Sequence, residues 1–349
     1  MKKIFLLIAF SSLCFIGCKK DKTEDPPAPV GTNVYMCGYS FNAAANVRYA
    51  CYWKNGTIVP LTSNTTQGND PSAQDMAVVG NDIYIVGGEK NSSGIYVAKY
   101  WKNGVVTNIT DGTRIGYAYA IEVKGSDVYI AFNEINGVGK EVIKLWKNGV
   151  ITSITDGSNI ANCSGIAVSG SDVYIVGSEN NGSINIPKYW KNGVAVNIPV
   201  TNVQNTFFQD IAVSGNDVYV VGTEYTPLKT AVIYKNGTPV WLTAAGIPRT
   251  ELGGLVINGT DIYVGGTIPN ALSGYFVATY WKNGTSVSLT DGTTDAVVRD
   301  MFVFNSDVYA TGLVIGSGGF GIATWWKNGT LNTVGNTTES STALSIIVQ

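Results

Sequence analysis

Short apolar runs alternate with polar turn residues along most of the chain, and the pattern repeats. The clearest marker is Lys-Asn-Gly preceded by Trp or Tyr. It occurs seven times, at spacings of 44 to 48 residues, with the aromatic residue at positions 53, 101, 146, 190, 234, 281 and 326. A period of this length is typical of stacked or circular repeat folds. One repeat is therefore the structural unit of the chain.

Each repeat contains four short apolar runs. The first, such as Ile121-Glu122-Val123, leads through a polar turn to Asp-Val-Tyr or Asp-Ile-Tyr, which opens the second. The third ends in the aromatic-Lys pair, and the fourth follows Asn-Gly. Asn-Gly is a strong hairpin signal because a two-residue type I′ turn needs positive φ at both positions. Four short antiparallel strands per repeat predict a propeller blade, which buries both faces against its neighbours.

The repeat region does not begin and end at the same point of the four-strand repeat. The region begins on a second strand, Asn33-Val34-Tyr35, and ends on a first strand at residues 343–348. Pairing these segments completes a seventh blade, whereas a linear solenoid would leave unpaired edges at both ends. We predict an all-β protein: a seven-bladed β-propeller of four-stranded antiparallel blades over residues 33–349, closed by pairing of the C-terminal strand with the N-terminal blade.

The repeat resembles two known blade types. Second strands that end in Gly87-Gly88 and Gly265-Gly266, followed by an aromatic residue on the third strand, resemble kelch-type blades. The form A-x-Y-W-K-N-G-x-x-x-x-L is also similar to bacterial extracellular propeller repeats written A-x-x-W-x-x-G-x-x-x-x-L. The double Gly is present in two blades of seven. The resemblance covers residues 33–349 and implies the fold, while propellers host many different activities.

The N-terminus has the pattern of a targeting segment. Lys2 and Lys3 precede an apolar stretch, residues 4–16, that is too short for a comfortable membrane span. The sequence Phe15-Ile16-Gly17-Cys18 resembles a bacterial lipobox, in which the Cys is lipidated and becomes the mature N-terminus. We predict a lipoprotein signal peptide at residues 1–17 and a lipidated Cys18 with a flexible linker at 18–32. The alternative is an ordinary secretory signal with a chance Cys.

Composition narrows the partners. The net charge is −2 and only 14% of residues are charged, which argues against nucleic acid. We expect a monomer that contacts the membrane through its N-terminal lipid at the outer membrane, facing outward from the cell. Three cysteines lie in the repeats. Cys37 and Cys51 fall on neighbouring strands, so the sequence leaves open a disulfide or two buried thiols.

The residue inventory excludes several kinds of enzyme. The chain has no His, which removes Ser-His-Asp hydrolysis and His-ligated metals. Gly-x-Ser-x-Gly, phosphate-binding and dinucleotide-binding motifs are also absent. Three Thr-Asp-Gly sequences, at Asp111, Asp156 and Asp291, lack the alternating acidic ligands of calcium loops, and we expect neither a metal nor a cofactor. A pair of carboxylates that hydrolyses glycans stays open, because such pairs are defined in space.

Repeated polar and aromatic residues have structural explanations. A Trp at one position in every blade is expected to fill space between sheets rather than to stack on a ligand. The Asp of Asp-Val-Tyr is expected to bond backbone at its turn, and the Lys of Lys-Asn-Gly to be solvated. The face that carries the loops between second and third strands, and between blades, varies in length and chemistry. Binding residues concentrate on such loops when a rigid scaffold displays them.

On that face we predict ligand-binding residues of two kinds. Asp75, Asp210 and Asp300 occupy equivalent positions at the start of first strands and should surround part of a central funnel. The others are cationic or aromatic loop residues, which suit sugars: Arg114, Tyr117, Phe207, Phe208, Arg249 and Arg299. The alternative is that the Asp side chains cap loops and the aromatic residues plug the funnel.

The expected function is a non-catalytic binding module for a glycan or a protein on a surface-exposed lipoprotein. The two alternatives are a carbohydrate-active enzyme, either hydrolase or lyase, that uses Asp or Glu, and a structural spacer.

Overall fold

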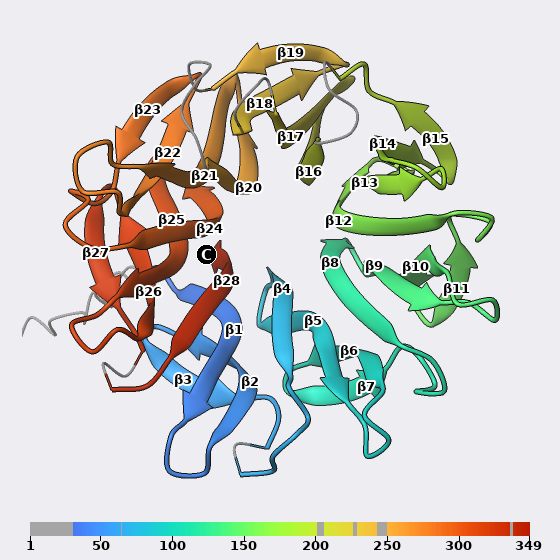
Figure 1. The fold of residues 1–349 in the computed structure, drawn as a ribbon, viewed down its shortest axis with the longest axis horizontal. Helices are drawn as coiled ribbons and strands as arrows, with labels where there is room; N and C mark the ends of the chain where they lie inside the picture. Colours follow the sequence, from blue (N-terminus) through green and yellow to red (C-terminus); the bar gives the residue numbers. More distant parts are fainter. Residues whose placement is uncertain (1–30, 64, 201–205, 226–228, 243–249, 336–337) are drawn as a thin grey trace, which may run out of the picture. The chain divides into compact units, whose positions relative to one another are not determined.

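The computed structural model describes residues 31–63, 65–200, 206–225, 229–242, 250–335 and 338–349. Residues 33–349 form one compact unit. In the described ranges this unit contains 28 strands and no helix, and they form seven antiparallel sheets of four strands each. Figure 1 shows the sheets arranged as the blades of a ring. The predicted seven-bladed β-propeller is confirmed.

The four strands of each blade lie side by side, in order from the centre of the ring to its outside. The innermost strands are β28 (Ser341–Val348), β4 (Ser72–Val79), β8 (Gly116–Lys124), β12 (Ile160–Ser169), β16 (Phe207–Ser214), β20 (Glu251–Asn258) and β24 (Ala296–Phe304). The second strands are β1 (Val34–Asn42), β5 (Asp82–Lys90), β9 (Asp127–Ile135), β13 (Asp172–Asn180), β17 (Asp217–Tyr225), β21 (Asp261–Pro269) and β25 (Asp307–Ile315).

The two outer strands of each blade are joined by the Asn-Gly turn. The third strands are β2 (Val47–Lys54), β6 (Tyr96–Lys102), β10 (Glu141–Lys147), β14 (Asn185–Lys191), β18 (Lys229–Lys235), β22 (Phe276–Lys282) and β26 (Gly321–Lys327). The outermost strands are β3 (Thr57–Pro60), β7 (Val105–Asn108), β11 (Val150–Ser153), β15 (Val194–Asn197), β19 (Thr238–Trp241), β23 (Thr285–Ser288) and β27 (Thr330–Thr333). Each Asn of these turns has φ between 47° and 52°, as a type I′ turn requires.

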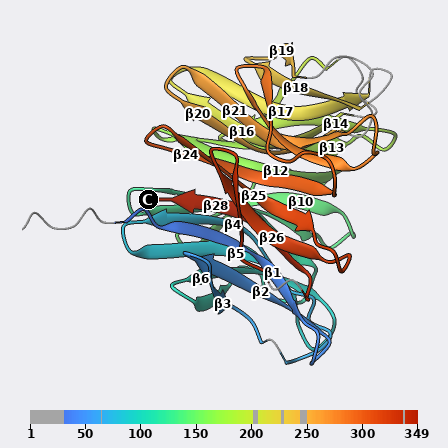
Figure 2. The same ribbon diagram turned by 90° about the vertical axis from the view of Figure 1, so that its left-hand side faces the viewer.

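The ring closes through a blade built from both ends of the repeat region, here called the closing blade (β28, β1, β2 and β3). β28 pairs antiparallel with β1, from Val34 opposite Val348 to Ser40 opposite Ser341. The two strands lie side by side in both views (Figures 1 and 2). The predicted closure is confirmed.

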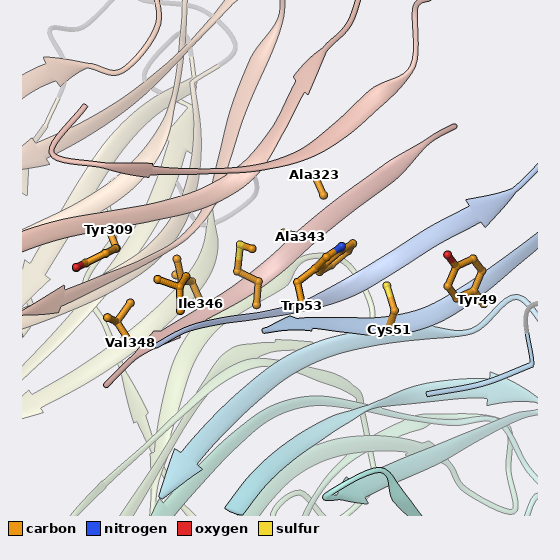
Figure 3. Close-up of a cluster of buried hydrophobic side chains, with 10 residues drawn as sticks. Tyr49, Cys51, Trp53, Tyr309, Ala323, Ala343, Ile346 and Val348 are labelled. Carbon is orange, nitrogen blue, oxygen red and sulfur yellow. The ribbon is translucent and has the colours of Figure 1, made fainter. Parts of the chain in front are cut away.

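Apolar side chains also pack between the closing blade and the blade that precedes it in the ring. Figure 3 shows one cluster in which Trp53 of β2, Ile346 of β28 and Tyr309 of β25 come together from distant parts of the sequence. Trp53 and Ile346 are 0% exposed. Burial of this kind is worth about 1.5–3 kcal/mol for each large apolar side chain. The N- and C-terminal ends of the repeat region are therefore held by their cores as well as by strand pairing.

The repeated aromatic residues serve the same packing. Trp101, Trp190, Tyr234, Trp281 and Trp326 are 3% exposed or less, and only Trp146 of the seven is half-buried. The prediction that they fill space between sheets is confirmed. Cys37, Cys51 and Cys163 are buried and free of disulfides, and desolvation raises the pKa of each thiol. No described helix is present that could cross a lipid bilayer.

Candidate functional site

Strand direction gives the ring two different faces. The turn face carries the hairpins from first to second strand and from third to fourth strand. The loop face carries the connections from second to third strand and from blade to blade. The hairpins of the turn face are uniform, whereas the loops vary, so the two faces offer different chemistry.

One set of contacts recurs on the turn face. In the β4 blade, Asn103 accepts a hydrogen bond from the Ile83 amide at 2.8 Å and donates to Asp82 at 2.8 Å. The other oxygen of Asp82 lies 2.9 Å from Lys102 Nζ, which sits 5.0 Å from the centre of the Tyr84 ring. The Asn side chain therefore joins the outer hairpin to the start of the second strand.

The Asn-to-Asp bond has the same partners throughout the ring. Its other copies are Asn148–Asp127, Asn192–Asp172, Asn236–Asp217, Asn283–Asp261, Asn328–Asp307 and, with Asn as acceptor, Asn55–Asn33. This corrects two expectations. The Asp binds side chains of the neighbouring hairpin rather than its own turn, and the Lys is paired rather than simply solvated. Sequence analysis missed this because the partners lie about 20 residues apart.

The centre of the ring has a cavity that opens toward the loop face, here called the loop-face funnel, of about 220 Å³. Every innermost strand carries a β-bulge at this level, which turns extra side chains toward the centre. The bulged residues that line the funnel are Gln74, Tyr119, Ser164, Gln209, Gly253, Arg299 and Leu344. Because six different residue types occupy these seven positions, the bulge has no sequence signature.

Asp75, Asp210 and Asp300 follow three of these bulges and line the floor of the funnel. Their predicted position around the centre is confirmed, while their role toward a ligand stays a prediction. A second cavity of about 380 Å³ opens on the opposite side and is lined by the same three Asp. The carboxyl groups thus stand at the boundary between two halves of the central channel.

Each of these carboxyl groups also joins two blades. Asp300 accepts from its neighbour Met301 at 2.7 Å and from the Ile346 amide of β28 at 2.9 Å. Asp210 bonds Leu255 of the next blade at 2.9 Å, and Asp75 bonds Ile121 of the next blade at 2.8 Å. Asp75 accepts a further bond from the Ser345 hydroxyl, at 2.9 Å. The three Asp side chains therefore bond amides of innermost strands, whereas the alternative expected them to cap loops.

Burial dominates the electrostatics of the floor. Desolvation, with the charge of Asp75 as a second cause, raises the pKa of Asp300 to about 8. Desolvation also raises the pKa of Asp210 to about 7 and that of Asp75 above its usual range. Glu122, on the β8 side of the second cavity, is raised to about 7 by burial and by Asp75. Backbone donors oppose these shifts but do not offset burial.

Two further predicted residues lie at or beside the funnel. Arg299 lines it, and its Nη1 lies 3.8 Å from Glu251 Oε2. Tyr117 does not line the funnel, but its hydroxyl accepts a hydrogen bond from Nε2 of Gln74, which does, at 2.9 Å. The structure thus brings Arg299 and the three Asp together, with Tyr117 next to them.

The remaining predicted residues lie elsewhere. Phe208 is 6% exposed and packs against Tyr234, with ring centres 5.6 Å apart, so its ring is core rather than ligand surface. Phe207, one residue earlier, is 46% exposed. Arg114 is exposed beside Gly137 of the β9–β10 loop and does not line the funnel. Arg249 and Cys18 lie outside the described residues, as does most of residues 1–32.

Metal-binding geometry does not occur in the described ranges, where no group of three or more Cys, Asp or Glu side chains is placed to hold an ion. The Thr-Asp-Gly sequences form local turns instead. Asp111 accepts bonds from the Thr113 amide at 2.8 Å and from its hydroxyl at 2.7 Å. Glu122 was not among the predicted site residues, although the sequence carries a signal for it: a charged residue stands where the other repeats have apolar ones.

Comparison with known proteins gives the fold but no family. No family model and no curated protein matches the chain. Among solved structures, a Mycobacterium tuberculosis puromycin-hydrolyzing peptidase matches with a TM-score of 0.57 and 10% identity, over 86% of this chain and 53% of that one.

Two weaker matches are a Pyrococcus horikoshii acylaminoacyl peptidase and a puromycin hydrolase. The first has a TM-score of 0.49 and 13% identity, over 75% of this chain and 46% of that one. The second has a TM-score of 0.45 and 8% identity, over 77% and 54%. The chain spans about half the length of the structures it matches.

These findings correct the expected function. At 10% identity the likeness shows the fold alone. The matched structure is that of a peptidase, so the comparison counts against the prediction of a non-catalytic binding module for a glycan or a protein.

Proposed function

We propose that this protein is a carboxylate-dependent hydrolase of carbohydrates that acts in the loop-face funnel. The observation that carries the proposal is the convergence of Asp75, Asp210 and Asp300, from three blades, on the floor of one open cavity. The chain has no His, and these carboxyl groups are the acid–base groups that the structure gathers on the floor of the funnel.

Glycoside hydrolysis uses two carboxyl groups in opposite protonation states. Asp300, with its pKa raised to about 8, would be protonated near pH 7 and would donate its proton to the leaving glycosidic oxygen. Asp75 would accept a proton from the attacking water, whose oxygen bonds the sugar carbon as the C–O bond breaks. Each oxygen of Asp300 accepts one bond from a backbone amide, and so does Asp75 Oδ2, which leaves each of them a second lone-pair site for this chemistry. Asp75 Oδ1 accepts from both the Met76 amide and the Ser345 hydroxyl, so Oδ2 is the oxygen that would take the proton.

The lining of the funnel supports a sugar substrate. Gln74, Gln209 and Ser164 offer amide and hydroxyl groups, and Tyr119 offers an aromatic face. Sugars are bound by stacking on aromatic rings together with hydrogen bonds from such groups. Peptide hydrolysis is a second candidate, favoured by the fold likeness to the puromycin-hydrolyzing peptidase.

The test is turnover of a panel of oligosaccharides and peptides, followed by Asp300→Asn and Asp75→Asn. Removal of a general acid or base should lower kcat about 10²- to 10⁴-fold. Asp261→Asn on the turn face is the matched control and should leave kcat unchanged, because Asp261 pairs with Lys282 far from the funnel floor. Equal turnover in Asp300→Asn, Asp75→Asn and the wild type would disprove the proposed mechanism.

The location is proposed from the sequence. We infer that Cys18 carries a lipid that anchors the protein at the outer membrane with the propeller outside the cell, and that its blades are of the kelch-like type. Gly17-Cys18 and the Gly87-Gly88 and Gly265-Gly266 pairs support these assignments. Cys18→Ala should move the protein from the membrane fraction to a soluble or unprocessed form. Unchanged mass and unchanged membrane partition would argue against lipidation.

A further inference from the structure

The loop face holds a group of charged and aromatic side chains that has no counterpart among the described residues of the other blades. It lies between the closing blade and the β4 blade. We call it the Arg48 cluster, and it consists of Tyr39, Arg48, Asp70, Lys90 and Tyr96. All five side chains are half-buried, so each keeps an accessible part.

Contacts hold the cluster together around Asp70. Arg48 Nη1 lies 3.1 Å from one Asp70 oxygen, and Lys90 Nζ lies 3.6 Å from the other. The hydroxyl of Tyr96 donates a hydrogen bond to the same carboxylate. The Arg48 guanidinium carbon sits 3.7 Å from the centre of the Tyr39 ring, and Lys90 Nζ sits 4.9 Å from that of Tyr96.

The cluster has a positive charge to spare. Two cations, Arg48 and Lys90, share the single carboxylate of Asp70, which leaves one unbalanced positive charge. The neighbouring Glu89 is engaged by Lys99 at 2.5 Å. Arg48 Nε is buried and makes no hydrogen bond to any residue in the described ranges. A guanidinium stacked on an aromatic ring keeps its N–H groups in one fixed plane, which suits a carboxylate ligand.

The repeat shows that the fold does not need these residues. Each position of the cluster holds other residue types elsewhere in the ring. The position of Tyr39 on the second strand is occupied in the other blades by Gly88, Asn133, Ser178, Thr223, Thr267 and Leu313. The position of Lys90 is occupied by Phe41, Ile135, Asn180, Tyr225, Pro269 and Ile315. In their described residues the other six blades form without this chemistry, so its presence between two blades indicates a function beyond folding.

A chain of contacts leads from the cluster to the funnel. Tyr96 packs edge-on against Tyr117, with ring centres 5.6 Å apart. Tyr117 accepts the hydrogen bond from Gln74, whose side chain lines the funnel next to Asp75. A polymer that extended from the funnel toward this cluster would therefore pass over Gln74 and Tyr117 and then reach Arg48 and Lys90.

We propose that the Arg48 cluster is a subsite for the carboxylate of an acidic sugar, so that the substrate of the funnel is a uronate-containing oligosaccharide. This rests on the proposed function for its substrate class and reaction. Arg48 and Lys90 bind the carboxylate, Asp70 and Tyr39 hold the guanidinium in place, and Tyr96 and Tyr117 support the sugar rings on the way to the funnel.

The test compares a tetrasaccharide of galacturonate with its methyl ester, which has the same shape without charge. Binding is measured by calorimetry in the Asp300→Asn variant, so that turnover does not interfere. We expect the acid to bind at least about tenfold more tightly than the ester, the scale of a charged hydrogen bond. Arg48→Gln and Lys90→Gln should each remove most of this preference. Lys102→Gln, the same change on the turn face, should leave it intact.

Thermal melting of each variant separates loss of binding from loss of folding, and Lys90→Gln serves where Arg48→Gln destabilises the blade. Equal binding of acid and ester, no binding of the acid, or an acid preference that survives both substitutions would overturn the subsite. Charge-dependent binding with no hydrolysis of any substrate would refute the enzyme and keep the subsite. Hydrolysis with equal turnover of acid and ester would do the reverse.

Discussion

The turn face repeats one set of contacts around the ring, whereas the loop face has different side chains in each groove. On the turn face, Asn, Asp, Lys and Tyr meet with nearly the same distances from blade to blade. These contacts join strands within a blade and use no residue that the repeat does not supply. They belong to the fold.

The loop face departs from the repeat at the places where chemistry is possible. Acidic residues follow three of the seven bulges, and one unbalanced positive charge lies between the closing blade and the β4 blade. A ring of identical units would not need these differences in order to close. In a repeat protein, function is therefore indicated by the residues that differ from the repeat. The residues that the repeat supplies most often serve the fold.

The largest expected effect comes from a change that destroys both faces at once. Deletion of residues 343–349 removes the inner strand of the closing blade, with the buried Ala343, Ile346 and Val348. Loss of large buried side chains costs about 2–5 kcal/mol each, and total stability is on the order of 5–15 kcal/mol. Cooperative thermal unfolding should be lost or shifted far down. A truncated protein that melts like the wild type would mean that the ring is closed in another way.

An intermediate effect is expected at the floor between the faces. Asp300→Asn leaves an amide of β28 or of Met301 without a proper acceptor, at a cost of about 1–3 kcal/mol. Because the pKa of Asp300 is raised, its contribution to stability is complete below its unfolded value of about 4 and is lost as the pH rises through about 8. The advantage of the wild type over Asp300→Asn in urea unfolding should therefore shrink between those values.

On the turn face, the stability contributed by a carboxyl group should depend on pH in the opposite direction, which provides a control. A hydrogen bond from Lys282 lowers the pKa of Asp261, so its contribution is present above the usual pKa of Asp and is lost as the pH falls. The advantage of the wild type over Asp261→Asn should thus shrink on the acid side and weaken in high salt, because the pair is exposed. Parallel pH profiles for the two variants would contradict the electrostatic distinction between floor and turn face.

The smallest expected effect is the difference in stability between two variants of one repeated turn, Asn103→Ala and Asn103→Gly. This difference separates the cost of the backbone conformation from the loss of side-chain hydrogen bonds. Asn103 has a φ of 52°, where Ala costs about 1–2 kcal/mol and Gly does not. Asn103→Ala should be destabilised by that amount plus the loss of the bonds to Ile83 and Asp82, whereas Asn103→Gly should lose the bonds alone. Arg114→Ala on the loop face should change the melting temperature little. Equal melting of the Ala and Gly variants would argue against a strained turn.

The sequence by itself determined the fold. The period of the Lys-Asn-Gly motif, the hairpin chemistry of Asn-Gly and the phase of the two ends predicted seven four-stranded blades and their closure, because these signals act over a few residues and repeat. It also placed Asp75, Asp210 and Asp300 at the centre, since equivalent positions in a ring share one radius. Phe208 showed the limit of this reasoning, because alternation along a strand decides which of two neighbouring aromatic rings is buried.

Only the tertiary structure decided how side chains from different blades meet. The bulges that line the funnel arise from strand pairing and have no residue signature. The pKa values of the three Asp depend on burial by several blades, and the bonds from Asp300 to β28 join residues 46 positions apart in the chain. The Arg48 cluster combines residues of two neighbouring blades that meet only when these blades pack against each other. Contacts of this kind depend on distance in space, which a linear sequence does not record.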